Sequence, residues 1–320
     1  MSGLPIVLGP HGQVADLRSG AVPVDGLDLD FVTVKRMPDA YRDMARTQPY
    51  AISEMAPTTY LMALEAGAPL TAFPIPMTRR FRHKGVLRRR DGPVSGPKDL
   101  EGRRVGVRAY AVTAAVWTRG ILAEEFGVDP DKVAWLVQEA DNVESFAPPA
   151  NVRLIPDGES MAGLMERGGI DAAFEGLAGI GGGEGDGLVE LVEDAAAREA
   201  EWFRRTGIYP LHGVIAVRND VIRDHPEIGR LLFDAFARAK RNYWSRVESG
   251  AAAGKEDERY RKLARVVGDP LPYGLEENRA TFEALVRYAR GQRLIATAPR
   301  IEAVFPDPRT TPAATVAKWS

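Results

Sequence analysis

The stretch Arg104–Val128, RVGVRAYAVTAAVWTRGILAEEFGV, contains a complete strand-to-helix unit. Its first residues, Arg104–Val107, form a short apolar run that predicts a buried strand. A helix is predicted over Thr113–Glu125, because Trp117 has another apolar residue one turn further on and Gly127 is a typical helix stop. A strand that leads into a helix is the repeating unit of α/β proteins. The stretch therefore predicts an α/β fold.

Strands and helices are predicted to alternate on both sides of this stretch. Before it, the pattern predicts strands over 4–8, 27–34, 50–55 and 70–75, with helices over 38–46 and 57–66. After it, the pattern predicts strands over 133–137, 170–174 and 213–217, with helices over 160–167, 226–247 and 281–290. Such alternation is typical of a mostly parallel sheet. A length of 320 residues suits two lobes, at roughly 150 residues per domain.

Composition and charge exclude several classes of function. The formal net charge is −2, whereas nucleic-acid-binding domains are usually strongly basic, so no nucleic-acid partner is expected. No run approaches ~18 uninterrupted apolar residues, so no membrane-spanning helix is expected. The first residues, MSGLPIVLGPHG, lack the basic region and long apolar core of a signal peptide, which predicts a cytoplasmic protein. The absence of cysteine removes disulfides, thiolate metal sites and cysteine nucleophiles.

The basic run Arg79–Lys84, RRFRHK, is the densest charge signal in the chain. If this run is a strand, alternate side chains share a face. One face would then carry Arg79, Phe81 and His83, and the other Arg80, Arg82 and Lys84. Arginine matches a carboxylate as a rigid two-pronged fork, so Arg79 and Arg82 are candidates for holding a carboxylate. The alternative is a charged strand on the protein surface.

A second candidate for anion binding follows the strand predicted at 104–107. Arg108 comes directly after this strand, and Thr113 begins the predicted helix. Free backbone N–H groups and the helix dipole attract negative charge at such a position. We therefore expect Arg108 and Thr113 to contact an anionic ligand. The alternative is that Thr113 only caps its helix.

Histidines and glutamates near strand ends are further candidates for the site, either as ligand contacts or in proton transfer. His11 follows the first predicted strand, His83 lies in the basic run, and His212 precedes the last predicted strand. Glu54 and Glu175 lie at the ends of two other predicted strands, where α/β folds place ligands. The alternative is a structural histidine or an ordinary surface glutamate. No His-x-x-His or His-Glu-x-x-His spacing occurs, so no metal site is expected.

Longer blocks of the sequence carry a family pattern between residues 27 and 306. These blocks are FRHKGVLRRR (81–90), DLEGRRVGVRAYAVTAAVWTRGILAEEFGV (99–128), IPDGESMAGLMERGGIDAAF (155–174), EAEWFRRTGIYPLHGVIAVRNDVIRDHPEI (199–228) and PLPYGLEENRATFEALVRYA (270–289). Together they resemble the 4,5-dihydroxyphthalate decarboxylase family. The resemblance implies an α/β, two-lobed, type II periplasmic-binding-protein-like fold with a ligand cleft between the lobes. Its first lobe would comprise residues 1–80 and 218–320, and its second lobe residues 81–217.

The resemblance also implies an activity. The family's enzymes remove one carboxylate from a dihydroxylated phthalate without a known organic cofactor, so we expect no cofactor and a small aromatic carboxylate as the partner. A homo-oligomer is left open. Three segments depart from the family pattern: GPHGQ at 9–13, the alanine at 109, and FEGL at 174–177. These departures keep open a decarboxylase that acts on a different aromatic or heteroaromatic acid.

Decarboxylation of a hydroxylated ring requires an anion clamp, a base near the hydroxyl group, and an acid over the ring carbon that bears the carboxylate. We predict His83 as the proton donor, with His212 second. Glu54 or Glu175 would accept the hydroxyl proton or orient a histidine. The substrate-binding residues would be Arg79, Arg82 and Arg108 as the clamp, Phe81 or Trp117 stacked on the ring, and His11 and Thr113. The alternative function is a solute-binding protein, which needs the clamp but no acid–base pair.

Overall fold

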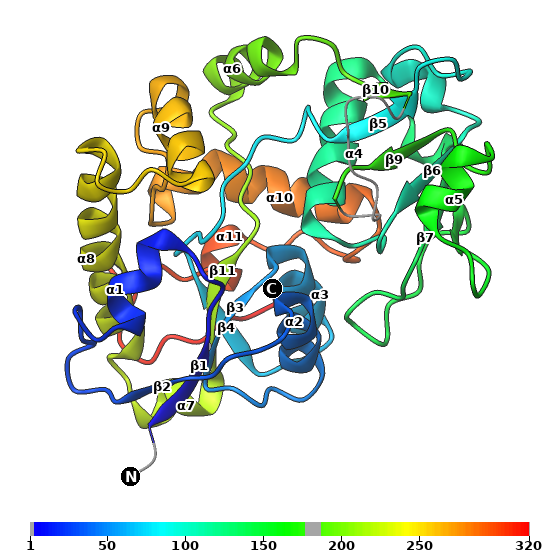
Figure 1. Cartoon of the computed structure of the whole chain (residues 1–320). Helices are drawn as coiled ribbons and strands as arrows, with labels where there is room; N and C mark the ends of the chain where they lie inside the picture. Colours follow the sequence, from blue (N-terminus) through cyan, green and yellow to red (C-terminus); the bar gives the residue numbers. More distant parts are fainter. Residues whose placement is uncertain (1–2, 177–186, 320) are drawn as a thin grey trace. The chain divides into compact units, whose positions relative to one another are not determined.

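The strands of the chain form two separate mixed sheets, one in each of two compact units (Figure 1). The computed structural model describes residues 3–176 and 187–319. Unit 1 comprises Met1–Arg80, Thr206–Val286 and Thr297–Ser320, and unit 2 comprises Phe81–Arg205 and Arg287–Ala296. Two segments that we predicted in the other lobe therefore change place. Residues 206–217 belong to unit 1, because they lead into a strand of its sheet, and residues 287–296 belong to unit 2.

Unit 1 is built on a five-stranded sheet with the order β2-β1-β3-β11-β4. Its strands are β1 (Leu4–Val7), β2 (Leu29–Phe31), β3 (Ile52–Met55), β4 (Leu70–Phe73) and β11 (Val214–Arg218). β1 pairs in parallel with β2 and β3, whereas β11 runs antiparallel to both β3 and β4. The sheet is therefore parallel only in part, and β11 corrects the prediction of a mostly parallel sheet.

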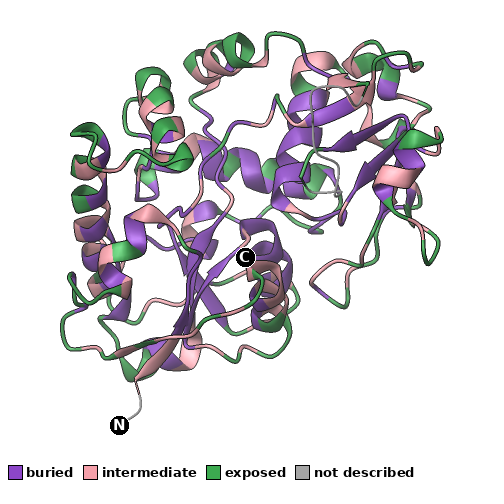
Figure 2. Cartoon of the chain, in the orientation of Figure 1, coloured by how far each residue is buried: buried purple, intermediate pink, exposed green. Residues whose placement is uncertain are grey.

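The helices of unit 1 pack against this sheet or against one another. They are η1 (Gly12–Val14), α1 (Ala15–Arg18), α2 (Met37–Arg46), α3 (Pro57–Glu65), α7 (Asn219–Asp224), α8 (Ile228–Glu248), α9 (Lys255–Val267), η4 (Glu276–Asn278) and α11 (Ile301–Val304). One side of α8 is apolar and buried, and Ile228, Leu232 and Phe236 join Ile6 and Ile52 of the strands in one core. Figure 2 shows buried residues along the strands of unit 1. α8 also packs against η1 and α1, so it supports the chain that follows β1.

Unit 2 contains a six-stranded sheet with the order β10-β5-β9-β6-β7-β8. Its strands are β5 (Val86–Arg89), β6 (Arg104–Val107), β7 (Ala134–Val137), β8 (Val152–Leu154), β9 (Ala172–Phe174) and β10 (Leu188–Glu190). Its helices are η2 (Pro97–Leu100), α4 (Thr113–Phe126), η3 (Pro130–Lys132), α5 (Met161–Glu166) and most of α6 (Ala195–Thr206), while α10 (Arg279–Gly291) has residues in both units. The predicted strand and helix of the stretch at 104–128 are confirmed as β6 and α4. Gly127 ends α4 in the left-handed conformation.

The basic run Arg79–Lys84 is not a strand. Arg79 forms only an isolated bridge with Leu211, and the residues after it have no strand pairing before β5. The alternation that a strand would give is nevertheless present, because Arg79, Phe81 and His83 are buried while Arg80 and Lys84 are exposed. Among the described helices, none is long and apolar enough to cross a membrane.

Candidate functional site

The parallel pairing of β1 and β3 brings His11 and Glu54 together in unit 1. The register places Val7 opposite Ser53, so the chain that leaves β1 passes the end of β3. The His11 Nε2 atom lies 2.8 Å from Glu54 Oε2. Carboxyl ends of parallel strands are where α/β folds place their ligands. From the sequence, His11 is predicted to bind substrate, and Glu54 is predicted to accept a proton or to orient a histidine.

Both oxygens of the Glu54 carboxylate accept hydrogen bonds, and the residue is only 2 % exposed. The backbone N–H of Gly9 donates a hydrogen bond of 3.0 Å to Oε2, the same oxygen that faces His11. The Tyr41 hydroxyl of α2 donates a bond of 3.3 Å to Oε1. A buried carboxylate needs such partners, because an unpaired buried charge is very costly. Glu54 is therefore a buried carboxylate of unit 1 with hydrogen bonds on both oxygens, rather than a surface glutamate.

Two glycines leave space for this pair. A Cβ atom on Gly213 would lie 2.5 Å from Glu54 Oε1, and a Cβ atom on Gly9 would lie 2.5 Å from His11 Nε2. Real Cβ atoms essentially never approach other heavy atoms so closely. Any other residue at either position would displace the carboxylate or the imidazole ring.

The electrostatics of the pair favour an ion pair. Burial alone would lower the pKa of His11, but attraction to Glu54 and the hydrogen bond with it outweigh burial and raise that pKa above its ordinary value of 6.5. Burial would raise the pKa of Glu54, but His11, the Gly9 N–H and the Tyr41 hydroxyl together lower it. His11 thus favours the imidazolium form beside a carboxylate. Its side chain is 22 % exposed, so its proton can exchange with solvent or a ligand.

A second layer of charged and aromatic groups supports the His11 loop. Gly12 lies directly against the ring of Tyr243, whose hydroxyl donates a 2.5 Å hydrogen bond to Asp257 of α9. The neighbouring Glu256 forms a salt bridge with Arg259, and its negative charge also favours the protonated form of His11. The loop after β1 is therefore fixed by α8 and α9 as well as by β3.

His83, our predicted proton donor, has a different environment in unit 2. It is 3 % exposed and packs edge-to-face on Trp202, with ring centroids 5.2 Å apart. Neither ring nitrogen has a hydrogen-bond partner among the residues that the structure describes. Burial, with a smaller contribution from Arg198, lowers the pKa of His83 to about 4. These are the properties of a neutral core histidine.

His212 and Glu175, which were also predicted to be catalytic, lie in different units. His212 lies in unit 1, with Nε2 3.1 Å from the carbonyl oxygen of Arg80. Glu175 is an exposed residue that directly follows β9 in unit 2.

The predicted clamp and ring-stacking residues occupy three kinds of environment. Arg79 is 1 % exposed, and its guanidinium donates hydrogen bonds to the Asn278 side chain and the Tyr209 carbonyl oxygen. Arg108 is partly exposed and forms a 3.0 Å salt bridge with Glu139. Three of the predicted residues are buried in unit 2. Phe81 packs against Trp202 and Phe203, Trp117 packs edge-to-face on Tyr288, and Thr113 begins α4. Arg82 is half-buried.

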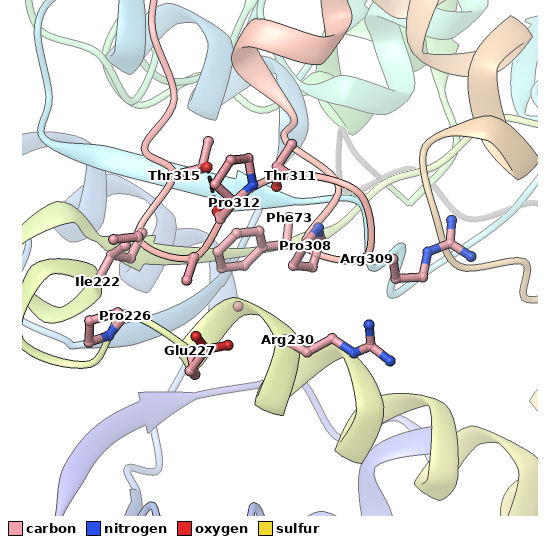
Figure 3. Close-up of a pocket in the computed structure, with 13 residues that line it drawn as sticks. Phe73, Ile222, Pro226, Glu227, Arg230, Pro308, Arg309, Thr311, Pro312 and Thr315 are labelled. Carbon is pink, nitrogen blue, oxygen red and sulfur yellow. Dashed lines mark hydrogen bonds between the residues drawn. The ribbon is translucent and has the colours of Figure 1, made fainter.

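A separate pocket of about 240 Å³ lies in unit 1 between the start of α8 and the segment 308–315 (Figure 3). Phe73 and three prolines line it, and Arg230 and Arg309 lie toward one end in Figure 3. Both arginines are already engaged, Arg230 with Asp234 and Arg309 with two carboxylates. The pocket contains none of the predicted site residues. Within the described ranges, no three His, Asp or Glu side chains are grouped to hold a metal ion.

Sequence reasoning missed Tyr41 and Gly213. Tyr41 lies on a helix whose residues carry no motif, and only the packing of α2 on β3 brings its hydroxyl to Glu54. Gly213 is recognisable in sequence only as a glycine before a strand. Its importance follows from the antiparallel insertion of β11 beside β3, which the sequence did not indicate.

Comparison with known proteins identifies relatives along most of the chain. The family model described as NMT1/THI5 like matches residues 25–152. A 4,5-dihydroxyphthalate decarboxylase of Comamonas testosteroni is 30% identical over 289 residues, which are 86% of this chain and 87% of the relative. A 4,5-dihydroxyphthalate decarboxylase of Pseudomonas putida is 29% identical over 210 residues, covering 63% of this chain and 81% of that protein.

Solved structures agree on the fold. The periplasmic aliphatic sulphonate binding protein SsuA of Escherichia coli matches with a TM-score of 0.54 at 12% identity, covering 98% of this chain and 94% of that chain. The desulfurization enzyme DSZB matches with a TM-score of 0.54 at 16% identity, covering 96% and 97%. The chain thus has the two-lobed periplasmic-binding-protein fold, and its sequence relatives show that it belongs to the 4,5-dihydroxyphthalate decarboxylase family.

Proposed function

We propose that this protein is a decarboxylase of a hydroxylated aromatic carboxylic acid, such as 4,5-dihydroxyphthalate, and that His11 is its general acid. The observation that carries the proposal is the 2.8 Å contact between His11 Nε2 and the buried carboxylate of Glu54. Family membership supplies the reaction class, since two relatives carry the name of a decarboxylase. Solute binding requires no proton transfer to carbon, whereas decarboxylation requires a proton donor.

The chemistry requires a proton on carbon before CO2 leaves. Direct loss of CO2 would leave an unstable aryl carbanion. When a ring hydroxyl ortho or para to the carboxylate gives up its proton, electron density moves into the ring, and the carbon bearing the carboxylate accepts a proton. The C–C bond to the carboxylate then breaks, CO2 departs, and the bond's electron pair restores the aromatic ring. One proton therefore replaces one CO2.

His11 is suited to deliver this proton. The pKa of its imidazolium is raised by Glu54, so the acid form is available near neutral pH, where a general acid works best. Glu54 stays ionised and stabilises the imidazolium without taking its proton. After the transfer, the partly exposed ring of His11 regains a proton from solvent. His83 is less suited, because burial lowers its pKa to about 4 and leaves it neutral.

The remaining roles go to residues of unit 2. Arg108, which directly follows β6, is our candidate for a carboxylate ligand, and the incoming carboxylate would replace Glu139 in its salt bridge. Arg82, half-buried, is the second candidate of the clamp. Arg79 receives no ligand-binding role, because its guanidinium is engaged inside unit 1. Glu175 is the candidate base for the hydroxyl proton.

The alternative function is solute binding without catalysis. The likeness in fold to SsuA favours it, since that protein is named for binding a sulphonate. The two functions differ in one measurement: incubation with a panel of hydroxylated aromatic mono- and di-acids, with CO2 release and ligand binding followed in parallel. The decarboxylase proposal predicts CO2 release from at least one acid that binds. Binding of several acids without any CO2 release would support the solute-binding alternative.

A further inference from the structure

The two oxygens of the Glu54 carboxylate have separate tasks. Oε2 receives the Gly9 N–H and faces His11, while Oε1 receives the Tyr41 hydroxyl at 3.3 Å. A carboxylate can rotate about its last side-chain bond, and terminal torsions of this kind are soft. The group on Oε1 therefore helps to keep Oε2 aligned with the imidazole ring, together with the Gly9 N–H on Oε2 itself.

Tyr41 reaches Glu54 from a helix that is firmly anchored. α2 packs against β3 and α3, and its residues Ala40 and Met44 are fully buried. Tyr41 lies beside these core positions and is half-buried, with its hydroxyl turned to the carboxylate. Gly213 lies beside the same oxygen, and a Cβ atom at this position would lie 2.5 Å from Oε1, so no other residue fits there without moving the carboxylate.

We propose that Tyr41 is a positioning residue of this site, whose hydroxyl holds Glu54 Oε1 so that Oε2 stays on His11. This inference rests on the proposed function for its catalytic meaning, because Tyr41 acts through Glu54. The hydroxyl also stabilises the charged form of the carboxylate, which otherwise loses ionisation on burial. After His11 and the Gly9 N–H, Tyr41 thereby helps to keep the carboxylate ionised as the pH falls.

Other charged and titratable groups lie near the pair and also influence its electrostatics. Glu256 of α9 raises the pKa of His11, and Arg18 of α1 lowers it. Arg18 also donates hydrogen bonds to the carbonyl oxygens of Leu8 and Gly9, which support the loop. Tyr273 lies close enough for the charge of Glu54 to raise its pKa. These groups remain in place when only the Tyr41 hydroxyl is removed.

The test is Tyr41→Phe, with Tyr50→Phe as a control that removes a hydroxyl from another half-buried tyrosine of unit 1. The chain has four histidines, so the ring signals of His11 can be assigned in NMR spectra by their loss in His11→Gln. The chemical shift of His11 reports its own titration and, at lower pH, the protonation of Glu54. This readout requires no substrate, so it tests Tyr41 even if no acid on the panel is decarboxylated.

In Tyr41→Phe we expect the low-pH inflection of His11 to move up by about one pH unit, the effect of losing one hydrogen bond to a charged group. The acidic limb of the kcat/KM profile should move in the same direction, with a smaller change in KM than in kcat. Tyr50→Phe should leave both unchanged. An unchanged low-pH inflection in folded Tyr41→Phe overturns the inference. If thermal unfolding shows that Tyr41→Phe does not fold, Tyr41→Leu, which also removes the hydroxyl and adds no titratable group, serves as the second variant and should show the same upward shift; an unchanged inflection there overturns the inference.

Discussion

His11 Nε2 and Glu54 Oε2 lie 2.8 Å apart, although 43 positions separate the two residues in the chain. The contact exists because β1 and β3 are parallel neighbours and Gly9 donates its N–H to the same carboxylate. It turns a partly exposed loop histidine into an acid whose protonated form is favoured. Arg79 and His83, which were also predicted as site residues, are not part of this pair.

Glu54→Gln should abolish the raised pKa of His11. Without the negative charge, burial is the main influence on the ring and lowers its pKa. We expect the turnover rate near neutral pH to fall and to recover partly at lower pH, where the ring becomes protonated again. A pH–rate profile and an NMR titration of His11 measure this effect. Glu248→Gln, which changes an exposed glutamate at the end of α8, is the control.

The ion pair should stabilise the folded protein within a defined pH window. The pKa of His11 is raised above 6.5, so its contribution is fully present below pH 6.5 and is lost as the pH rises through the folded pKa. The pKa of Glu54 is lowered below 4.5, so its contribution is present above pH 4.5 and is lost as the pH falls. The difference in unfolding free energy between wild type and His11→Gln should therefore be largest between pH 4.5 and 6.5. A difference that grows steadily above pH 8 would contradict the ion pair.

Gly213→Ala should disturb the site through contact alone. Its new methyl group would meet Glu54 Oε1, and relief of such overpacking costs about 1–3 kcal/mol of stability. We also expect a loss of activity larger than the loss of stability explains, because the carboxylate must turn away from His11. Gly291→Ala is the matched control, since its Cβ atom would meet open space. If the two variants have the same unfolding free energy in denaturant and the same turnover, the new methyl group at position 213 does not displace the Glu54 carboxylate.

Arg79→Met should reduce stability rather than ligand binding. The substitution leaves the Asn278 side chain and the Tyr209 carbonyl oxygen without their buried donor, at a cost of about 2–4 kcal/mol. Urea unfolding measures the cost, and binding of a substrate acid to the folded fraction should be nearly unchanged. Weakened binding with unchanged stability would return Arg79 to the carboxylate clamp.

His83→Leu should keep activity. The imidazole nitrogens of His83 have no hydrogen-bond partner among the described residues, so an apolar side chain of similar size replaces it at little cost. We expect unfolding free energy and turnover close to those of the wild type. Complete loss of turnover in a stable His83→Leu protein would instead restore His83 as the proton donor.

Local pattern predicted much of this fold, because its signals are short-range. The strand at 104–107 and the helix after it follow from a buried apolar run, helical spacing and a terminal glycine. The alternating burial of the run at 79–84 was also predictable from spacing, although the backbone there forms no ladder. The antiparallel position of β11 was not, since strand direction depends on where the chain returns after more than a hundred residues.

The site was predictable only in part. The sequence placed His11 and Glu54 near strand ends, where α/β folds hold ligands, but it predicted His83 rather than His11 as the proton donor. Their direct contact depends on register, which the sequence did not define. Tertiary packing also determines the role of Arg79. In sequence it looks like a free cation, but in the structure its buried guanidinium donates hydrogen bonds to the Asn278 side chain and the Tyr209 carbonyl oxygen. Charge is visible in sequence, whereas the partner that neutralises or binds it is a product of tertiary packing.

The role of His11 as general acid is tested most directly by comparing CO2 release from 4,5-dihydroxyphthalate, or the best acid of the panel, by wild type and His11→Gln. His225→Gln, which alters an exposed histidine after α7, serves as the control. We predict that His11→Gln still binds the acid but releases CO2 about 10²–10⁴-fold more slowly, the usual contribution of a general acid. A wild-type rate of CO2 release in His11→Gln would contradict the role proposed for His11.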